Sequence, residues 1–395
     1  MASKILDENV EIKIYLPPGY KGSEAKYPVF YLLDGQWFFL HAVSSQIAYT
    51  QRGVPETPEF IVVGIVTQGD RREKWLLTDS RPFLEFIERE LISFVDKNFR
   101  TSGERILFGW EASAGLVIGA LTQKNELFDA YLAASPTPLY GSYFPGYEKQ
   151  YRALERLFSD EKQSDKFLYF TAAENDYPAQ YGIDKLRQLL EEKKSPIRWE
   201  YRKLKGAEHR ETAYGTIFRG LKSYYYNYPA LTFNSLAEFR ESGEMKYIDQ
   251  YYRKRADRFG FKDKADLEKN LQMTRTNLML LAVAEDDFRT FDLLIGKFEA
   301  DDFLNKSFLG HANSYAQFYL KNKKPKKALD ILNSLLKRFP ASARIFNSLG
   351  DVYATLNDKA KALEYYKKAV ALSRENPDGR IDEYEKDLKN LSLSN

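Results

Sequence analysis

The segment from residue 106 to residue 121 most constrains the fold, because it combines a buried strand, a sharp turn and an apolar helix. Its first three residues form a short apolar run typical of a buried parallel strand, and its last six continue as an apolar helix. A G-x-S-x-G elbow of this kind strains the backbone of its central residue and admits only small residues two positions away. Glu111 has such neighbours in Gly109 and Ser113, whereas Ser113 has Glu111 on one side. The sequence therefore predicts a glutamate where a nucleophile normally stands.

The rest of the first half of the chain predicts further strands separated by helices. Segment 10–16 alternates apolar and polar residues, as a half-buried strand does. Segments 27–33 and 60–66 are almost continuously apolar, as strands are when helices cover both faces of a parallel sheet. Between them and the elbow, segment 82–98 places its apolar residues on one helical face. This alternation predicts an α/β fold with a doubly wound sheet.

Several of these segments resemble the enterochelin-esterase and esterase D branch of the α/β-hydrolases. The resemblance runs through residues 14–20, 28–35, 61–65, 71–78, 107–129 and 135–136. The family's usual small-His-Ser-x-Gly-Gly motif falls on residues 109–114, so that Glu111 takes the place of the nucleophilic serine. The resemblance implies an α/β-hydrolase domain over residues 1–230.

The resemblance also implies positions for the other members of a catalytic triad. In the family the base precedes a final helix, and His209 stands at that position. The acid follows a late strand, in a loop that here carries Glu174 and Asp176. Either carboxylate can reach an imidazole from this loop, and of the two we favour Glu174. With 3 histidines in 395 residues, a histidine at the family's base position is informative, and we expect His209 to be the base.

Acyl transfer also needs hydrogen-bond donors for a developing oxyanion. One is normally the backbone N–H after the nucleophile, which belongs to Ala112, and the other comes from the loop after an early strand, at Gly35 or Gln36. Trp37 and Trp110 adjoin these positions in the sequence. We expect them to line a pocket beside the elbow, although aromatic residues at such positions are more often part of a core.

Two hypotheses for Glu111 stay open. In the first, the domain is an esterase-like hydrolase that acts on a carboxylic ester or a related acyl substrate through His209, together with Glu111 or Ser113. Carboxylate attack on an ester gives a reactive anhydride, so a simple serine-esterase mechanism requires Ser113. In the second, Glu111 pairs with His209 and favours the imidazolium. The protein is then a catalytically silent pseudo-esterase whose pocket binds a polar ligand or serves as a scaffold.

The C-terminal third shows a period of 34 residues. The recurring pairs are Tyr319 and Tyr353, Ala328 and Ala362, and Leu332 and Tyr366. This is the period of the tetratricopeptide repeat, which segments 347–353 and 361–369 resemble. Small residues at recurring positions allow paired helices to approach closely. We expect a helical connector over residues 231–270 and a repeat domain over residues 271–395, used for packing, for homodimerisation or for contact with a peptide.

Composition excludes several other functions. Lys+Arg 59 against Asp+Glu 56 gives a net charge of +3, a balance too even to predict nucleic-acid binding. The chain has no cysteine and three scattered histidines, so we expect no disulfide, no thiol catalysis, no metal site and no cofactor. No apolar run has the length of a membrane span, and no signal peptide is visible. The sequence leaves a cytoplasmic location and export with a removed signal equally open.

Overall fold

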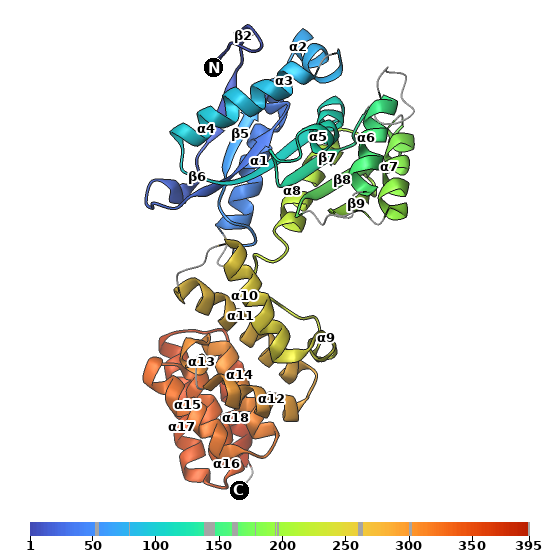
Figure 1. The fold of residues 1–395 in the computed structure, drawn as a ribbon. Helices are drawn as coiled ribbons and strands as arrows, with labels where there is room; N and C mark the ends of the chain where they lie inside the picture. Colours follow the sequence, from blue (N-terminus) through green and yellow to red (C-terminus); the bar gives the residue numbers. More distant parts are fainter. Residues whose placement is uncertain are drawn as a thin grey trace. The chain divides into compact units, whose positions relative to one another are not determined.

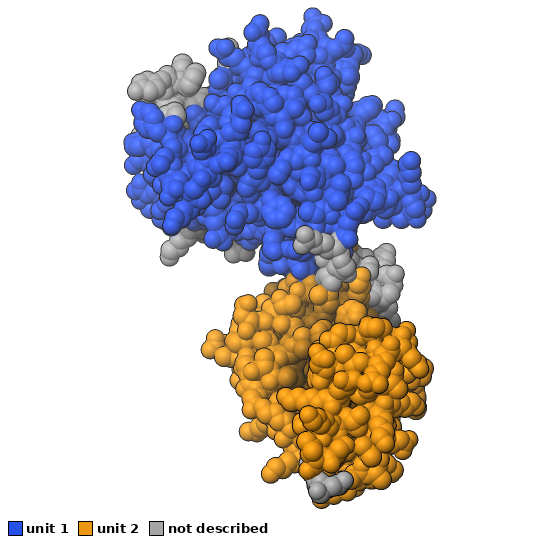
Figure 2. All heavy atoms as spheres, turned by 180° about the vertical axis from the view of Figure 1, so that it is seen from behind, with its two compact units in different colours: residues 1–229 blue, residues 230–395 orange. Residues whose placement is uncertain are grey.

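The chain folds into two units in the computed structural model, residues 1–229 and residues 230–395 (Figure 1 and Figure 2). The structure describes residues 1–51, 55–78, 80–137, 147–159, 165–177, 179–193, 195, 197–259, 264–299 and 302–393. Each unit has a hydrophobic core of its own. Among the described residues, no helix has both the length and the apolar character that crossing a membrane requires.

A seven-stranded sheet organises the first unit. Its strand order is β3 (Ile12–Tyr15), β5 (Ile61–Ile65), β4 (Tyr27–Leu32), β6 (Thr101–Trp110), β7 (Ala130–Ala134), β8 (Phe167–Ala173) and β9 (Arg198–Leu204). β3 pairs with β5 in the antiparallel sense, and every other neighbouring pair is parallel. The short strands β1 (Ala2–Ser3) and β2 (Glu8–Asn9) pair with each other outside this sheet. The α/β prediction is confirmed.

Helices cover both faces of this sheet (Figure 1). On one face lie α1 (Gly35–Thr50) and α8 (Glu211–Tyr224), which contact each other and pack over Phe108. On the other face lie α5, α6, α7 and the helical stretch α3, η3 and α4, whose buried side chains form one hydrophobic cluster with Leu107 of β6. Their bounds are α5 (Ala112–Gln123), α6 (Tyr147–Ser159), α7 (Gln180–Glu192), α3 (Arg81–Phe86), η3 (Ile87–Ile92) and α4 (Ser93–Asn98). Because both faces are covered, β4, β5, β7 and β8 are buried along their whole length.

Every regular element among the described residues of the second unit is a helix. In chain order they are α9 (Leu236–Ser242), α10 (Glu244–Phe259), α11 (Lys264–Ala284), α12 (Phe288–Glu299), α13 (Phe303–Lys306), α14 (Leu309–Lys321), α15 (Pro325–Arg338), α16 (Ala343–Thr355), α17 (Lys359–Glu375) and α18 (Ile381–Leu393). The residues predicted as a connector contribute Phe233, Leu236 and Ile248 to the same core as the later helices.

The repeat pairs α14 with α15 and α16 with α17. α15 shows why these segments form packed helices, since it begins at a proline and buries Ala328, Leu332 and Leu335 on one face. In α16, a Cβ at Gly350 would lie 2.4 Å from the ring of Tyr366 in α17. Small residues therefore do mark the close approaches of this domain, as the period predicts.

Candidate active site

Glu111 stands at the turn between β6 and α5. Its backbone has φ 55° and ψ −118°, a combination that residues with side chains rarely adopt. Neighbouring backbone hydrogen bonds hold this geometry: Glu111 N–H donates to Ala134 O at 2.9 Å, and Thr137 N–H donates to Glu111 O at 3.1 Å. The structure therefore places a glutamate at the strained tip of the strand-to-helix turn.

Gly109 and Ser113 explain why the chain tolerates this turn. A Cβ at Gly109 would lie 2.4 Å from the carbonyl carbon and oxygen of Ser113, so only glycine fits there. Ser113 is fully buried, and its Oγ accepts from Trp110 N–H at 2.7 Å and donates to Asp34 Oδ2 at 2.8 Å. The structure thus brings Ser113 to Asp34 rather than to His209.

Arg72, in α2 (Asp70–Glu73), holds the carboxylate of Glu111. Its Nη2 donates to Glu111 Oε2 at 3.1 Å, and the same guanidinium donates to the two carboxylate oxygens of Asp34 at 3.1 and 3.3 Å. Burial alone would lower the pKa of Arg72, but the two carboxylates raise it. Asp34 is fully buried, whereas the Glu111 side chain is 38% exposed. One guanidinium therefore ties an exposed carboxylate to a buried one.

Sequence reasoning missed the roles of Asp34 and Arg72. Asp34 lies two residues after the end of β4, and its carboxylate also accepts from Thr67 Oγ1 beyond the end of β5. Because β5, β4 and β6 are neighbours, their ends bring these residues to one edge of the sheet. A charged residue directly after an apolar segment was the available signal for Asp34. No comparable signal connects Arg72 with Glu111.

His209 contacts Asp176, and not the favoured Glu174. His209 Nδ1 lies 2.6 Å from Asp176 Oδ1, and Asp176 also accepts from Ser135 Oγ and from Ala173 N–H. The Glu174 carboxylate instead accepts from a backbone N–H at Gly206, at 2.9 Å. The prediction that Glu174 is the carboxylate beside His209 was therefore wrong. Two carboxylates in one loop look equivalent in a sequence, but the chain buries only Asp176 against the imidazole.

The hydrogen bond to Asp176 raises the pKa of His209 above its usual 6.5, against the lowering effect of burial. The charges of Asp176 and Glu111 add to the rise. Burial would raise the pKa of Asp176, but its hydrogen bonds with His209, Ser135 and the Ala173 N–H outweigh burial and lower it. Because a carboxylate only accepts, Nδ1 carries a proton and Nε2 is the nitrogen left to act as a base. Glu111 acts on His209 by charge, and no hydrogen bond joins the two among the described residues.

The predicted oxyanion-hole residues lie at two helix starts. Ala112 is the first residue of α5, and Gly35 and Gln36 are the first two of α1. The first N–H groups of a helix have no partner within it and favour negative charge. A Cβ at Gly35 would lie 2.8 Å from the carbonyl carbon of Gly64, and the Gln36 side chain accepts from a backbone N–H at 3.1 Å. Their role as oxyanion donors stays a prediction.

Two indole rings and two guanidinium groups surround the elbow. Trp110 Nε1 donates to His209 O at 3.1 Å, and the Trp37 ring lies edge-on to the Trp110 ring at 6.1 Å. Arg72 and Arg210 each lie within 6.0 Å of both indole centroids. Trp37 is 47% exposed, so this rim is open to a ligand on one side. Among the described residues, no cluster of three or more potential metal ligands is present.

Comparisons with known proteins agree with this architecture. A family model described as "Putative esterase" matches residues 3–221, and a tetratricopeptide repeat model matches residues 316–378. A search of curated proteins gives no match. Among solved structures, an IroE-like serine hydrolase from Shewanella oneidensis has a TM-score of 0.55 at 23% identity, covering 75% of this chain and 96% of that one.

A second solved structure, an uncharacterised protein from Capnocytophaga ochracea DSM 7271, has a TM-score of 0.54 at 15% identity and covers 100% of this chain and 98% of that one. At such identities these likenesses show the fold alone. The esterase model, by contrast, spans more than half of the 395 residues. The chain therefore belongs to this esterase family, and it carries tetratricopeptide repeats after the esterase domain.

Proposed function

We propose that the first unit hydrolyses carboxylic esters or related acyl compounds, with His209 as general base. The 2.6 Å contact between His209 Nδ1 and Asp176 Oδ1, beside the strained turn at Glu111, carries this proposal. A carboxylate on Nδ1 fixes the imidazole so that Nε2 can take a proton. Membership of an esterase family supports the same class of reaction.

Water is the proposed nucleophile, because Ser113 is buried against Asp34. The water oxygen bonds to the acyl carbon while His209 Nε2 takes its proton, and the N–H groups of Ala112 and Gly35 stabilise the oxyanion. When the intermediate collapses, the bond to the leaving oxygen breaks and His209 returns the proton to that oxygen. The products are a carboxylic acid and an alcohol.

Glu111 supports this reaction by charge rather than by attack. Attack by its carboxylate would form an anhydride, which is more reactive than the ester it comes from. Its negative charge near His209 instead stabilises the imidazolium that forms when the base takes a proton. The ion pair with Arg72 fixes where that charge lies.

The test is turnover of short-chain p-nitrophenyl esters by the full chain. His209→Ala should lower kcat/KM by about a hundredfold or more, the usual contribution of a general base. Asp176→Asn should also lower it, because Nδ1 loses its charged acceptor. Glu174→Gln is the matched control in the same loop and should leave kcat/KM unchanged. Equal activity of folded His209→Ala and unaltered protein would contradict the proposal.

The Arg72–Glu111 ion pair favours a second candidate function, the binding of a polar ligand without turnover. An ion-paired carboxylate occupies the position where an acyl-enzyme would form. Under this alternative, an ester panel gives no turnover with the natural chain. Glu111→Ser should then acquire labelling by a fluorophosphonate, which the natural chain resists. Turnover by the natural chain that depends on His209 excludes this alternative.

A further inference from the structure

The helix α1 of the first unit is uncharged along its whole length. Gly35–Thr50 contains no Asp, Glu, Lys or Arg, and burial lowers the pKa of its single histidine, His41. The helix α5 is also uncharged, but it is buried from Ala112 to Leu121. By contrast, α1 exposes Trp37, Leu40, Ser44, Ile47 and Ala48. A helix that is apolar on all sides is normally buried, so the outer face of α1 requires a partner.

The exposed residues of α1 have the spacing of a coiled-coil seam. Trp37, Leu40, Ser44 and Ile47 follow one another at steps of three, four and three residues. This alternation is the a and d pattern of a heptad, in which all the seam residues meet one partner helix. Leu40, in the middle of the seam, is 77% exposed. The spacing therefore favours a helix as the partner.

Two aromatic residues of α8 extend this surface. Tyr214 and Phe218 are both exposed, and each is fixed by a ring of α1. The Phe218 ring stacks on Tyr49 at 4.4 Å between centroids, and the Tyr214 ring lies 4.8 Å from that of His41. The surface is therefore formed before any partner binds. We call it the α1–α8 face, and its residues are Trp37, Leu40, Ser44, Ile47, Tyr214 and Phe218.

The area of the α1–α8 face matches that of a dimer interface. Its five large apolar side chains are between 38% and 77% exposed, so they present on the order of 500 Å² of apolar surface. Homodimer interfaces are about 65% apolar, so this amount belongs to an interface of about 800 Å² per partner. That is the size of a standard stable interface.

The absence of charge from α1 favours a second copy of this chain as the partner. In a twofold dimer the same patch of both copies meets, so a charged residue near the axis would face a like charge. No residue of α1 carries such a charge. A helix that lies on a lipid surface has Lys and Arg on its polar face, and α1 has neither.

The sizes of the seam residues select an antiparallel pairing of the two α1 helices. Leu40 is the most exposed of them and Ser44 is the smallest, so Leu40 of each copy fits over Ser44 of the other. The same offset places Trp37 of each copy over Ile47 of the other. Both contacts are reciprocal, as a twofold axis requires. Since Trp37 also lies at the rim of the candidate active site, the second copy covers the exposed side of that rim.

We propose that two copies of the chain associate through the α1–α8 face, with their α1 helices antiparallel and Leu40 of each copy against Ser44 of the other. This association does not depend on the proposed hydrolysis. It is measured without any substrate.

Sedimentation velocity of the full chain over a dilution series measures the association. The natural chain should be a dimer that dissociates on dilution. Leu40→Glu should weaken the dimer by about a hundredfold or more, because it puts an unpaired charge into a desolvated contact. Leu293→Glu, at an exposed leucine of α12 in the second unit, is the matched control and should leave the association unchanged. Far-UV circular dichroism checks that both variants fold.

Cross-linking tests the antiparallel pairing. The chain has no cysteine, so introduced thiols are the only ones present. Leu40→Cys chains and Ser44→Cys chains are incubated with oxidised glutathione, each alone and as a mixture. In the mixture the two thiols face each other. In either variant alone they are offset by four residues, about 6 Å along the helix axis, which exceeds the reach of a disulfide. The mixture should therefore form the disulfide-linked dimer about tenfold faster.

Three results would overturn the proposal. The first is a natural chain that stays monomeric at every concentration; if that monomer binds phosphatidylcholine vesicles and Leu40→Glu does not, the face belongs to a lipid surface. The second is a dimer that Leu40→Glu leaves intact or that Leu293→Glu weakens equally, which would place the contact elsewhere. The third is a mixture of cysteine variants that cross-links no faster than either variant alone.

Discussion

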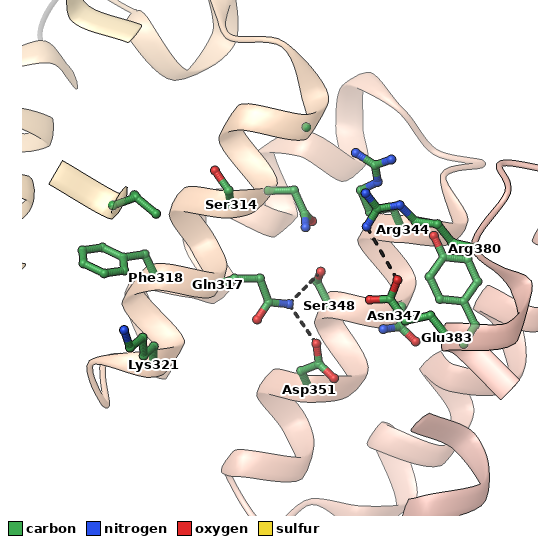
Figure 3. A pocket seen from close by; sticks show the side chains of 14 residues that line it. Ser314, Gln317, Phe318, Lys321, Arg344, Asn347, Ser348, Asp351, Arg380 and Glu383 are labelled. Atoms are coloured by element: carbon green, nitrogen blue, oxygen red, sulfur yellow. Dashed lines mark hydrogen bonds and ion pairs between the residues drawn. The ribbon is translucent and has the colours of Figure 1, made fainter. Parts of the chain in front are cut away.

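The elbow of the first unit and the polar cavity along α14 and α16 of the second unit (Figure 3) use polar groups in opposite ways. At the elbow, the guanidinium of Arg72 donates to both Glu111 and Asp34, so each of these carboxylates has a cationic partner within the chain. In the cavity, Asn313 and Asn347 each keep a buried oxygen that no described residue satisfies. A satisfied network stabilises the fold, whereas a buried acceptor without a donor costs stability. Substitutions should therefore cost more stability at the elbow than in the cavity.

Asp34→Ala should produce the largest effect. It removes a fully buried carboxylate that accepts hydrogen bonds from Arg72, Ser113 and Thr67. We expect a loss of about 3–5 kcal/mol in the free energy of unfolding, the usual cost of breaking a buried charge pair. Ser113→Ala, which removes one neutral donor from the same acid, should cost about 1 kcal/mol. Equal losses for the two variants would show that Asp34 does not organise the network.

Urea unfolding followed by tryptophan fluorescence measures this effect in the full chain. All four tryptophans lie in the first unit, at Trp37, Trp75, Trp110 and Trp199. The signal therefore reports the elbow unit without a contribution from the repeats. Far-UV circular dichroism on the same samples reports both units together.

Two glycines, one in each unit, test how far the surrounding atoms can move to make room for an added Cβ. A Cβ at Gly109 would meet the backbone of Ser113, whereas a Cβ at Gly350 would meet the side chain of Tyr366, each at 2.4 Å. Gly109→Ala should cost about 3 kcal/mol because the backbone of a strained turn cannot yield. Gly350→Ala should cost less, about 1 kcal/mol, since a ring can shift and alanine favours the helix. Thermal melts by circular dichroism test this ranking, and the reverse order would refute it.

These two glycines also show which features the sequence could predict. The elbow at Glu111 was predictable because the steric requirement falls on residues two positions away, and Gly109 and Ser113 meet it. The repeat was predictable because equivalent residues, such as Ala328 and Ala362, recur at a fixed period. In both cases the steric constraint falls on residues that are close in the sequence or that recur at a fixed period, so it can be read without the fold.

Features that depend on which strands become neighbours could not be predicted. Arg72 reaches Glu111 only because the ends of β5 and β6 lie on either side of β4. The choice between Asp176 and Glu174 depended on which carboxylate the chain buries, and both follow the same strand. The unsatisfied oxygen of Asn347 likewise appears only once packing has buried it.

Two arginines give a smaller contrast than the glycines. Arg72→Gln removes a guanidinium that serves two carboxylates and should cost about 2 kcal/mol, mostly through the buried Asp34. Arg344→Gln removes a guanidinium with no ion pair among the described residues, so the free energy of unfolding should stay within about 0.5 kcal/mol. Denaturant unfolding of both variants checks the difference. A comparable loss for Arg344→Gln would mean that Arg344 has a structural role in the repeats.

Glu111→Gln should produce the smallest effect, a shift in the pKa of His209. Both Asp176 and Glu111 raise this pKa above 6.5, so protonated His209 stabilises the fold below that value and the gain is lost as the pH rises through the raised pKa. Removing the charge of Glu111 should lower the pKa slightly and leave it above 6.5, because Asp176 remains. Burial lowers the pKa of His41, which should not change in the variant. Titration of the histidine ring protons by NMR measures both groups. Since the neutral imidazole is the proposed base, the acid limb of kcat/KM should move to lower pH by the same amount, and an unchanged His209 would show that the elbow carboxylate has no influence on the base.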